Sequence, residues 1–187
     1  MSSSSSSLNL YDLSVPIFTR ALESQLAFLK KGEQWCKDNN VDPEKLIQGR
    51  IAPDMLPLPF QVQSCCKHST GVLQRLGGAT PPPPPSSSVE NNNNDDDKSF
   101  ADLYARLESA IAQLKTAKKA EFAAPEATCK VQAGPREFDF NNLAYVQNFA
   151  LPNFFFHSQT AYLILRKEGV PVGKLDFLGP LDTLTGL

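Results

Sequence analysis

Two histidines occur in the sequence, His68 and His157, and His157 has the surroundings that favour chemistry. It directly follows the run Phe154–Phe156, in a segment that is apolar nearly all round and therefore predicts a buried helix. A buried neutral imidazole needs hydrogen-bond partners for its ring nitrogens, and those partners set its affinity for a proton. We therefore regard His157 as a candidate acid/base residue. A core histidine bonded to a carbonyl or to an aspartate is the alternative, and both interpretations remain open.

Asp54 is the second candidate for proton transfer, because it lies in a proline-rich loop, Arg50–Pro57, ahead of a predicted helix. A carboxylate at that place either serves as a general base in a pocket or forms a local loop hydrogen bond. Gln61 is a polar residue on the buried stripe of the same helix, where it either orients a ligand and bonds His157 or braces two helices. The candidate substrate-binding residues are Gln61, Asn153 and Phe154.

A metal site has little support from the spacing of the possible ligands. His68 stands seven residues after Gln61, about 10 Å further along the helix, and we expect it to be a surface or half-buried residue. Asp54, His68 and His157 form a two-histidine, one-carboxylate set in composition, but no HxxxH spacing accompanies them. The four cysteines lack zinc-like spacing and are expected to be reduced thiols: Cys36, Cys65, Cys66 and Cys129. We therefore predict no metal and no cofactor.

The elements that must position these residues are helices. Apolar residues at helical spacing predict four long helices, which cover about 15–38, 57–76, 99–119 and 151–169. Two short extended pieces, Thr128–Gln132 and Arg136–Asn141, predict a small hairpin, and the tail Val170–Leu187 is expected to be an extended strap. His157 lies near the predicted start of the last helix and Gln61 near the start of the second. We therefore expect them to meet only if these two helices run parallel.

The composition of the 187 residues predicts one domain, residues 10–179, with a formal net charge of −2. A serine-rich start (1–9) and a proline- and asparagine-rich insertion (80–97) are expected to be disordered, and a short C-terminal tail (180–187) follows the domain. Interspersed charges argue against a nucleic-acid partner. No segment approaches the ~20 apolar residues of a membrane span, and no signal peptide is evident, so we expect a cytoplasmic protein without a membrane partner.

Three sequence runs together resemble one family of unknown function, DUF1993, within the DinB/YfiT-like helical superfamily. These runs are RIAPDMLPLPFQVQ (Arg50–Gln63), LPNFFFHSQTAYLILRKEGV (Leu151–Val170) and GKLDFLG (Gly173–Gly179). The resemblance implies an all-α four-helix bundle, up-down-down-up, with a pocket at one end. In many superfamily members a divalent metal is held there by three histidines, two of them an HxxxH pair on the last helix. This sequence has Ala161 four residues after His157, so that site cannot be built here.

The leading functional hypothesis is a small-molecule enzyme or pocket protein with non-metal acid/base chemistry, of the isomerase, cyclase or lyase type. His157 and Asp54 are its predicted proton-handling pair, and its partner is an organic substrate. One alternative is a degenerate, metal-dependent DinB-like enzyme. Another is a non-catalytic ligand-binding or dimerisation module, and a homodimer is compatible with each hypothesis.

Overall fold

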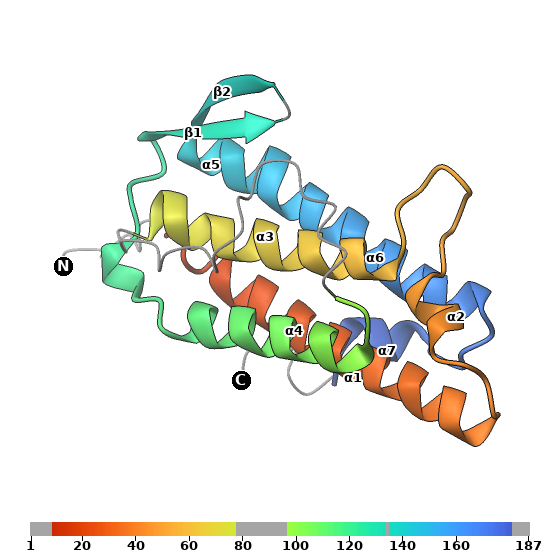
Figure 1. Cartoon of the computed structure of the whole chain (residues 1–187). Coiled ribbons are helices and arrows are strands. Elements are labelled where there is room, and N and C mark those ends of the chain that lie inside the picture. Colours follow the sequence, from red (N-terminus) through yellow and green to blue (C-terminus); the bar gives the residue numbers. More distant parts are fainter. Residues whose placement is uncertain (1–8, 78–96, 134, 181–187) are drawn as a thin grey trace.

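The computed structural model describes residues 9–77, 97–133 and 135–180 (Figure 1). The predicted N-terminal tail, the predicted insertion and the C-terminal tail therefore fall almost entirely outside the described residues. Asp97 is an exception, because it was assigned to the insertion and is described. Among the described residues, no helix is both long enough and apolar enough to cross a membrane.

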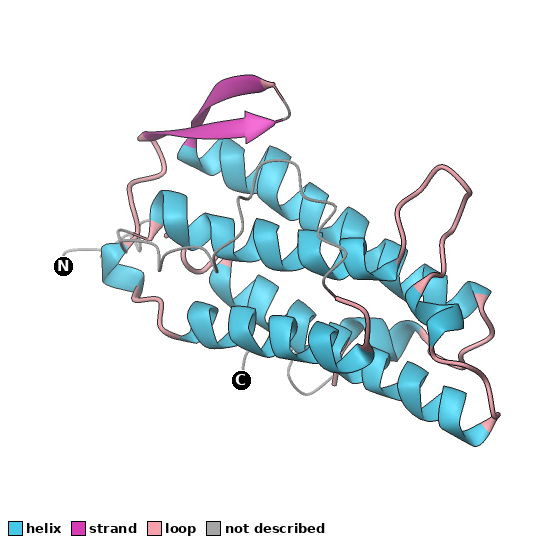
Figure 2. Ribbon diagram, viewed as in Figure 1, coloured by secondary structure: helices cyan, strands magenta, loops and turns pink. Residues whose placement is uncertain are grey.

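Four long helices lie side by side and make up most of the molecule (Figures 1 and 2). They are α1 (Val15–Asp38), α3 (Leu58–Leu76), α4 (Phe100–Lys115) and α6 (Leu151–Lys167). Helices α1 and α6 run in one direction and α3 and α4 in the other. The predicted all-α, up-down-down-up bundle is confirmed. Shorter elements complete the chain: α2 (Glu44–Ile47), a 3₁₀ turn (Lys119–Glu121), α5 (Asn142–Tyr145), a π-helical turn (Val146–Ala150) and α7 (Lys174–Leu178).

The apolar stripes that predicted the helices form the core. On α1, Phe18, Leu22 and Leu29 are spaced by four and seven residues, so they lie on one face of the helix, and all three are fully buried. The start of α4 is capped by Ser99, whose side chain accepts a hydrogen bond from the backbone N–H of Asp102 at 3.3 Å. Removing these apolar side chains from water is the main favourable contribution to the stability of the bundle.

The last helix is longer than predicted. It begins at Asn142, where the Asn141 side chain accepts hydrogen bonds from two backbone N–H groups, and continues without a break through the π-helical turn to Lys167. The predicted start at Leu151 is therefore wrong. Pro152 suggested a first helical turn, but the π-helical turn before it widens the helix where a proline would otherwise clash. The Asn153 side chain donates to the carbonyl of Phe149 at 2.7 Å within this irregular stretch.

Helix α6 is also less enclosed than its composition predicted. Phe154, Ala161 and Ile164 are fully buried, whereas 59% of Phe156 and 41% of Leu163 remain exposed. The helix thus packs through one face against α1 and α3 and leaves an apolar strip on the surface. The prediction that this helix is buried on all sides is wrong.

The connections include the predicted hairpin and one unpredicted helix. Strands β1 (Thr128–Ala133) and β2 (Arg136–Asn141) pair antiparallel, with Thr128 opposite Asn141. The tail that was expected to be an extended strap contains the helical turn α7 in its described part, to Pro180. An ion pair between Lys31 and Asp176 joins α7 to α1.

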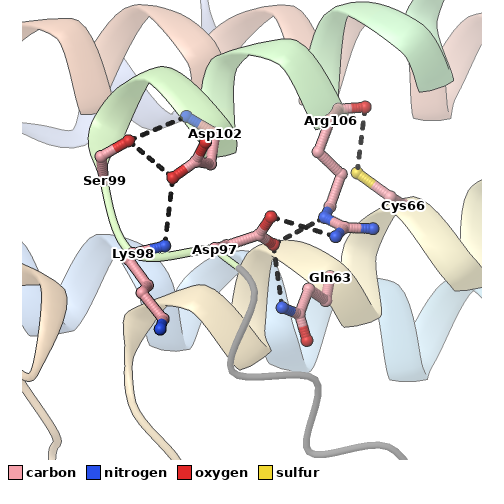
Figure 3. A network of polar contacts seen from close by, with 7 residues as sticks. All are labelled: Gln63, Cys66, Asp97, Lys98, Ser99, Asp102 and Arg106. Atoms are coloured by element: carbon pink, nitrogen blue, oxygen red, sulfur yellow. Dashed lines mark hydrogen bonds and ion pairs between the residues drawn. The ribbon is translucent and has the colours of Figure 1, made fainter.

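A polar network joins the start of α4 to α3 (Figure 3). Arg106 donates to both carboxylate oxygens of Asp97, at 2.7 and 3.0 Å, and Gln63 donates to the same carboxylate at 2.8 Å. Asp97 is only 8% exposed. We expected this aspartate to belong to a solvated run without a partner, and that prediction is wrong. Its bidentate pair with Arg106 instead holds the segment that directly precedes α4 against that helix.

Candidate functional site

The centre of the candidate site is a hydrogen bond between α3 and α6. The Oε1 atom of Gln61 lies 2.8 Å from Nδ1 of His157. Gln61 is 2% exposed, and its Nε2 donates to the carbonyl of Leu56 at 2.8 Å. The structure therefore brings together two of the residues that the sequence singled out.

The surroundings of Gln61 determine which nitrogen of His157 carries the proton. The Leu56 carbonyl can only accept, so it fixes the amide with its nitrogen toward Leu56 and its oxygen toward the imidazole. An amide oxygen accepts, and Nδ1 of His157 must therefore donate. In the neutral ring this leaves Nε2 unprotonated. Within the described part of the chain Nε2 has no hydrogen-bond partner, so its lone pair is available to a ligand.

His68 lies directly beside His157, although the sequence suggested that it would be distant. The two imidazole rings are nearly parallel, with 13° between their planes and 5.8 Å between their centroids. Burial lowers the pKa of His68 to about 4, with further lowering from His157, Lys67 and Arg75. Burial also lowers the pKa of His157. Both rings are therefore neutral at pH 7, which lets two imidazoles lie together without charge repulsion.

The contact between His157 and Gln61 of α3 follows from the direction and length of the last helix. We expected this contact only if α3 and α6 run parallel, and that condition is wrong. Cys65 donates its thiol to the carbonyl of Phe154 at 3.7 Å, while the earlier residue Gln61 meets the later residue His157, so the helices are antiparallel. Because the helix starts at Asn142 rather than Leu151, His157 lies near its middle and reaches the first turn of α3.

Aromatic rings flank the two histidines. Phe60 and Phe156 contact the His157 ring edge to face, with centroid distances of 5.7 and 5.2 Å. Phe149 contacts His68 at 5.8 Å. This aromatic cluster restricts the orientations of the imidazoles and gives them a weakly polar environment.

The other predicted site residues lie apart from the hydrogen-bonded pair. Asp54 is exposed and forms no hydrogen bond or ion pair with the described part of the chain. Asn153 is bonded to a backbone carbonyl of its own helix. Phe154 is fully buried, and its ring packs against Phe18 at 4.8 Å. The partner of His157 is thus Gln61, and a role of Asp54 in proton transfer remains a prediction.

The residues around His157 do not fit the metal site that the superfamily implies. The donors brought together here are two imidazoles and one amide oxygen, and that oxygen is already bonded to Nδ1 of His157. The helical position four residues after His157 is the buried Ala161. Across the described ranges, no three His, Cys, Asp or Glu side chains form a group that could hold a metal ion.

Two cavities differ in how their charges are paired. A small cleft of about 200 Å³ lies beside His68, between α3, β1 and the start of the last helix; it is lined by Lys67, His68, Arg75, Val131, Gln132, Tyr145 and Phe149. A larger groove of about 1170 Å³ runs along α1 and α7 and has no histidine in its lining. Three of its four charged residues are in ion pairs, Lys115 with Glu23 at 2.7 Å and Asp176 with Lys31, and the fourth, Arg20, donates to the carbonyl of Leu178. The cleft, with two cations and no carboxylate in its lining, is the better candidate for ligand binding.

Sequence reasoning missed this cleft and the pairing of the two histidines. A glycine inside a predicted helix, Gly71, midway between His68 and Arg75, was the available signal. Glycine in a helix interior costs roughly 1 kcal/mol relative to alanine, so it often marks a place where another group approaches closely.

Comparison with known proteins gives the family but no activity. The chain matches the model of a domain of unknown function, DUF1993, over residues 10–178. It is also similar to a crystal structure of a DinB family member protein from Shewanella denitrificans, with a TM-score of 0.78 and 33% sequence identity, over 91% of this chain and 92% of that chain. No curated protein matches the sequence. The resemblance read from the three sequence runs is confirmed.

Proposed function

Because the chain belongs to the family of unknown function DUF1993, whose description carries no activity, we propose a function from its own residues: proton transfer to or from a small organic molecule at His157. The observation that carries the proposal is the hydrogen bond from Nδ1 of His157 to Oε1 of Gln61 at 2.8 Å. This bond holds the ring in the tautomer whose Nε2 accepts a proton. A general base needs that combination of a fixed orientation and a free lone pair.

The protonation state of His157 supports a role as a base. Because burial lowers its pKa, the imidazole is unprotonated at neutral pH and is ready to remove a proton. Once protonated, the ring is positively charged in a partly buried place and returns the proton readily. Gln61 contributes by position alone, since an amide neither gains nor loses a proton in this range.

Hydrogen–deuterium exchange into a substrate tests the proposal without knowledge of the complete reaction. A base that removes a C–H proton exchanges that proton with solvent. We would therefore incubate the protein in D₂O with a panel of keto acids, unsaturated acids and aldehydes, and follow each C–H signal by proton NMR. We expect the wild-type protein to accelerate exchange in at least one compound. His157→Gln should abolish the acceleration, and the exposed variant Lys118→Gln should retain it.

Two results would refute the proposal. One is the absence of acceleration in every compound of the panel, with the fold of the protein verified by circular dichroism. The other is equal exchange rates in the wild-type protein and in His157→Gln.

A further inference from the structure

The cleft beside His68 contains an arginine whose position is prepared by two separate elements. Arg75 of α3 donates to the carbonyl of Gly71 at 3.0 Å and to the carbonyl of Lys130, on β1, at 3.2 Å. Its guanidinium lies over the ring of Tyr145, 5.5 Å from the centroid. Three contacts, one each from α3, β1 and α5, thus hold a charged group that is only partly exposed.

Gly71 explains how the guanidinium is accommodated. A Cβ atom at this position would lie 2.8 Å from Nη1 of Arg75 and 3.6 Å from the hydroxyl oxygen of Tyr145. Any other residue here would displace the arginine or the tyrosine. The cost of a glycine in the middle of a 19-residue helix is therefore offset by the placement of Arg75.

The charge of this arginine is not balanced by the protein. Arg75 donates to two backbone carbonyls and has no carboxylate partner among the described residues. Lys67, at the same cleft, is exposed and forms no ion pair or hydrogen bond with the described part of the chain. Elsewhere in the structure lysines commonly have acidic partners, as in the pairs of Lys115 with Glu23 and of Lys45 with Glu168. Two unbalanced cations at one small cleft create a positive potential that attracts an anion.

The remaining walls of the cleft are apolar and aromatic. Phe149 and Tyr145 lie with 25° between their ring planes and 6.1 Å between centroids, and Val131 closes the side formed by β1. A volume of about 200 Å³ admits a molecule with a single ring or a short unsaturated chain. His68 lines the cleft, and its ring stacks on that of His157 with 5.8 Å between the centroids.

We infer that the cleft binds a small planar carboxylate, with its carboxylate between Lys67 and Arg75 and its unsaturated or aromatic body against Phe149. Guanidinium and ammonium groups are the usual partners of a carboxylate, and an aromatic wall suits a flat apolar body. The inference names the substrate class of the proposed proton transfer. Only the claim that the bound carboxylate is also a substrate rests on that proposed function. Binding itself depends on the cleft alone.

The experiment uses benzoate as the probe and the two histidine side chains as reporters. With ¹⁵N-histidine-labelled protein, we would titrate benzoate and compare it with benzamide, which has the same ring without the charge, and with inorganic phosphate. We expect benzoate to shift the His68 signals saturably and to raise the pKa of His68, because an anion favours the protonated ring. Benzamide should cause no saturable shift, and phosphate should bind more weakly than benzoate.

Matched variants identify the binding groups. Lys67→Gln should weaken benzoate binding by about tenfold, and Arg75→Gln by at least as much. Lys118→Gln, an exposed lysine outside the cleft, should bind as the wild-type protein does. Because Arg75 also joins α3 to β1, Lys67→Gln provides the decisive comparison if the arginine variant fails to fold.

The outcomes separate this inference from the proposed function. No saturable shift with benzoate, an equal shift with benzamide, or unchanged affinity in Lys67→Gln would each overturn the anion cleft. His157→Gln should still bind benzoate, since His157 does not line the cleft. Saturable benzoate binding without accelerated deuterium exchange in any compound of the panel would support the cleft and refute the proton transfer. Exchange that His157→Gln abolishes, together with no saturable shift by benzoate, would support the proton transfer and refute the cleft.

Discussion

Replacing the buried Gln25 by methionine should stabilise the protein. Gln25 lies on α1 with no exposed surface, and neither its amide nitrogen nor its amide oxygen forms a hydrogen bond in the described structure. Its nearest polar group is the thiol of Cys65, which contacts the amide but is only a weak hydrogen-bonding group and donates to the carbonyl of Phe154. In the unfolded chain the amide is hydrated, so folding removes its bonds to water without replacing them.

The size of the effect follows from the number of unpaired atoms. Leaving a buried polar group without a partner costs about 1–3 kcal/mol. Methionine has nearly the same shape as glutamine, and its flexible thioether fills the same space without a polar atom. We therefore expect Gln25→Met to raise the free energy of unfolding by about 2 kcal/mol. For a domain of this size that corresponds to an increase in melting temperature of about 4–8 °C.

The same substitution at Gln61 supplies the matched control. Gln61 is equally buried, but it accepts from Nδ1 of His157 and donates to the carbonyl of Leu56. Gln61→Met leaves both of those groups unpaired and should lower the free energy of unfolding by about 2 kcal/mol. Urea unfolding followed by circular dichroism measures both variants. A loss of 1 kcal/mol or more in Gln25→Met would refute the reasoning, because it would mean that the amide has a partner in solution.

Three further predictions concern charge. Asp97→Asn should lower the free energy of unfolding by about 2 kcal/mol, because it weakens a mostly buried bidentate pair with Arg106. Glu121→Gln, which removes a charge from an exposed ion pair, should change the free energy of unfolding by less than about 0.5 kcal/mol, and urea unfolding of both variants measures the difference. The pKa of His68 is lower in the folded than in the unfolded protein, so the folded state binds fewer protons and stability should fall as the pH drops from about 6.5 to about 4. In His68→Phe, the urea concentration at the midpoint of unfolding should fall less across this pH range than in the wild-type protein. Gln61→Glu should raise the pKa of His157, since a carboxylate beside the imidazole favours its protonated form; histidine NMR titration measures it, and an unchanged or lower pKa would contradict the assigned contact.

The positions of the helices along the chain could be predicted because they depend on patterns within each segment. Apolar residues at helical spacing identified α1, α3 and α4, whereas the up-down-down-up arrangement came from the family resemblance. The start of the last helix could not be found in this way. Pro152 ordinarily belongs to a first helical turn, and a π-helical turn that lets a helix continue into a proline has no marked sequence pattern.

Asp97 shows a second limit of local reasoning. It ends a run of three aspartates after four asparagines, a composition typical of solvated chain. Its burial comes from Arg106 and Gln63, which lie nine and thirty-four residues away in the sequence. A partner at such separations is determined by how α3 and α4 pack, and composition contains no information about it.

The candidate site depends on the register between α3 and α6, and that register places His157 in contact with both Gln61 and His68 of α3. Gln61 and His68 are seven residues apart, two turns of α3, and therefore project from the same side of the helix about 10 Å apart. His157 enters from the antiparallel α6 between them, so that Gln61 holds Nδ1 while His68 stacks on the ring. A displacement of α6 by one turn, about 5.4 Å, would lose one of these contacts and move the imidazole away from either its orienting amide or the cleft. The long helical run from Asn142 sets this register, because it places Tyr145 and Phe149 at the cleft and His157 two to three turns further on. The continuous helix from Asn142, which the sequence did not predict, thus places the cleft beside Arg75 and the neutral imidazole of His157 close together.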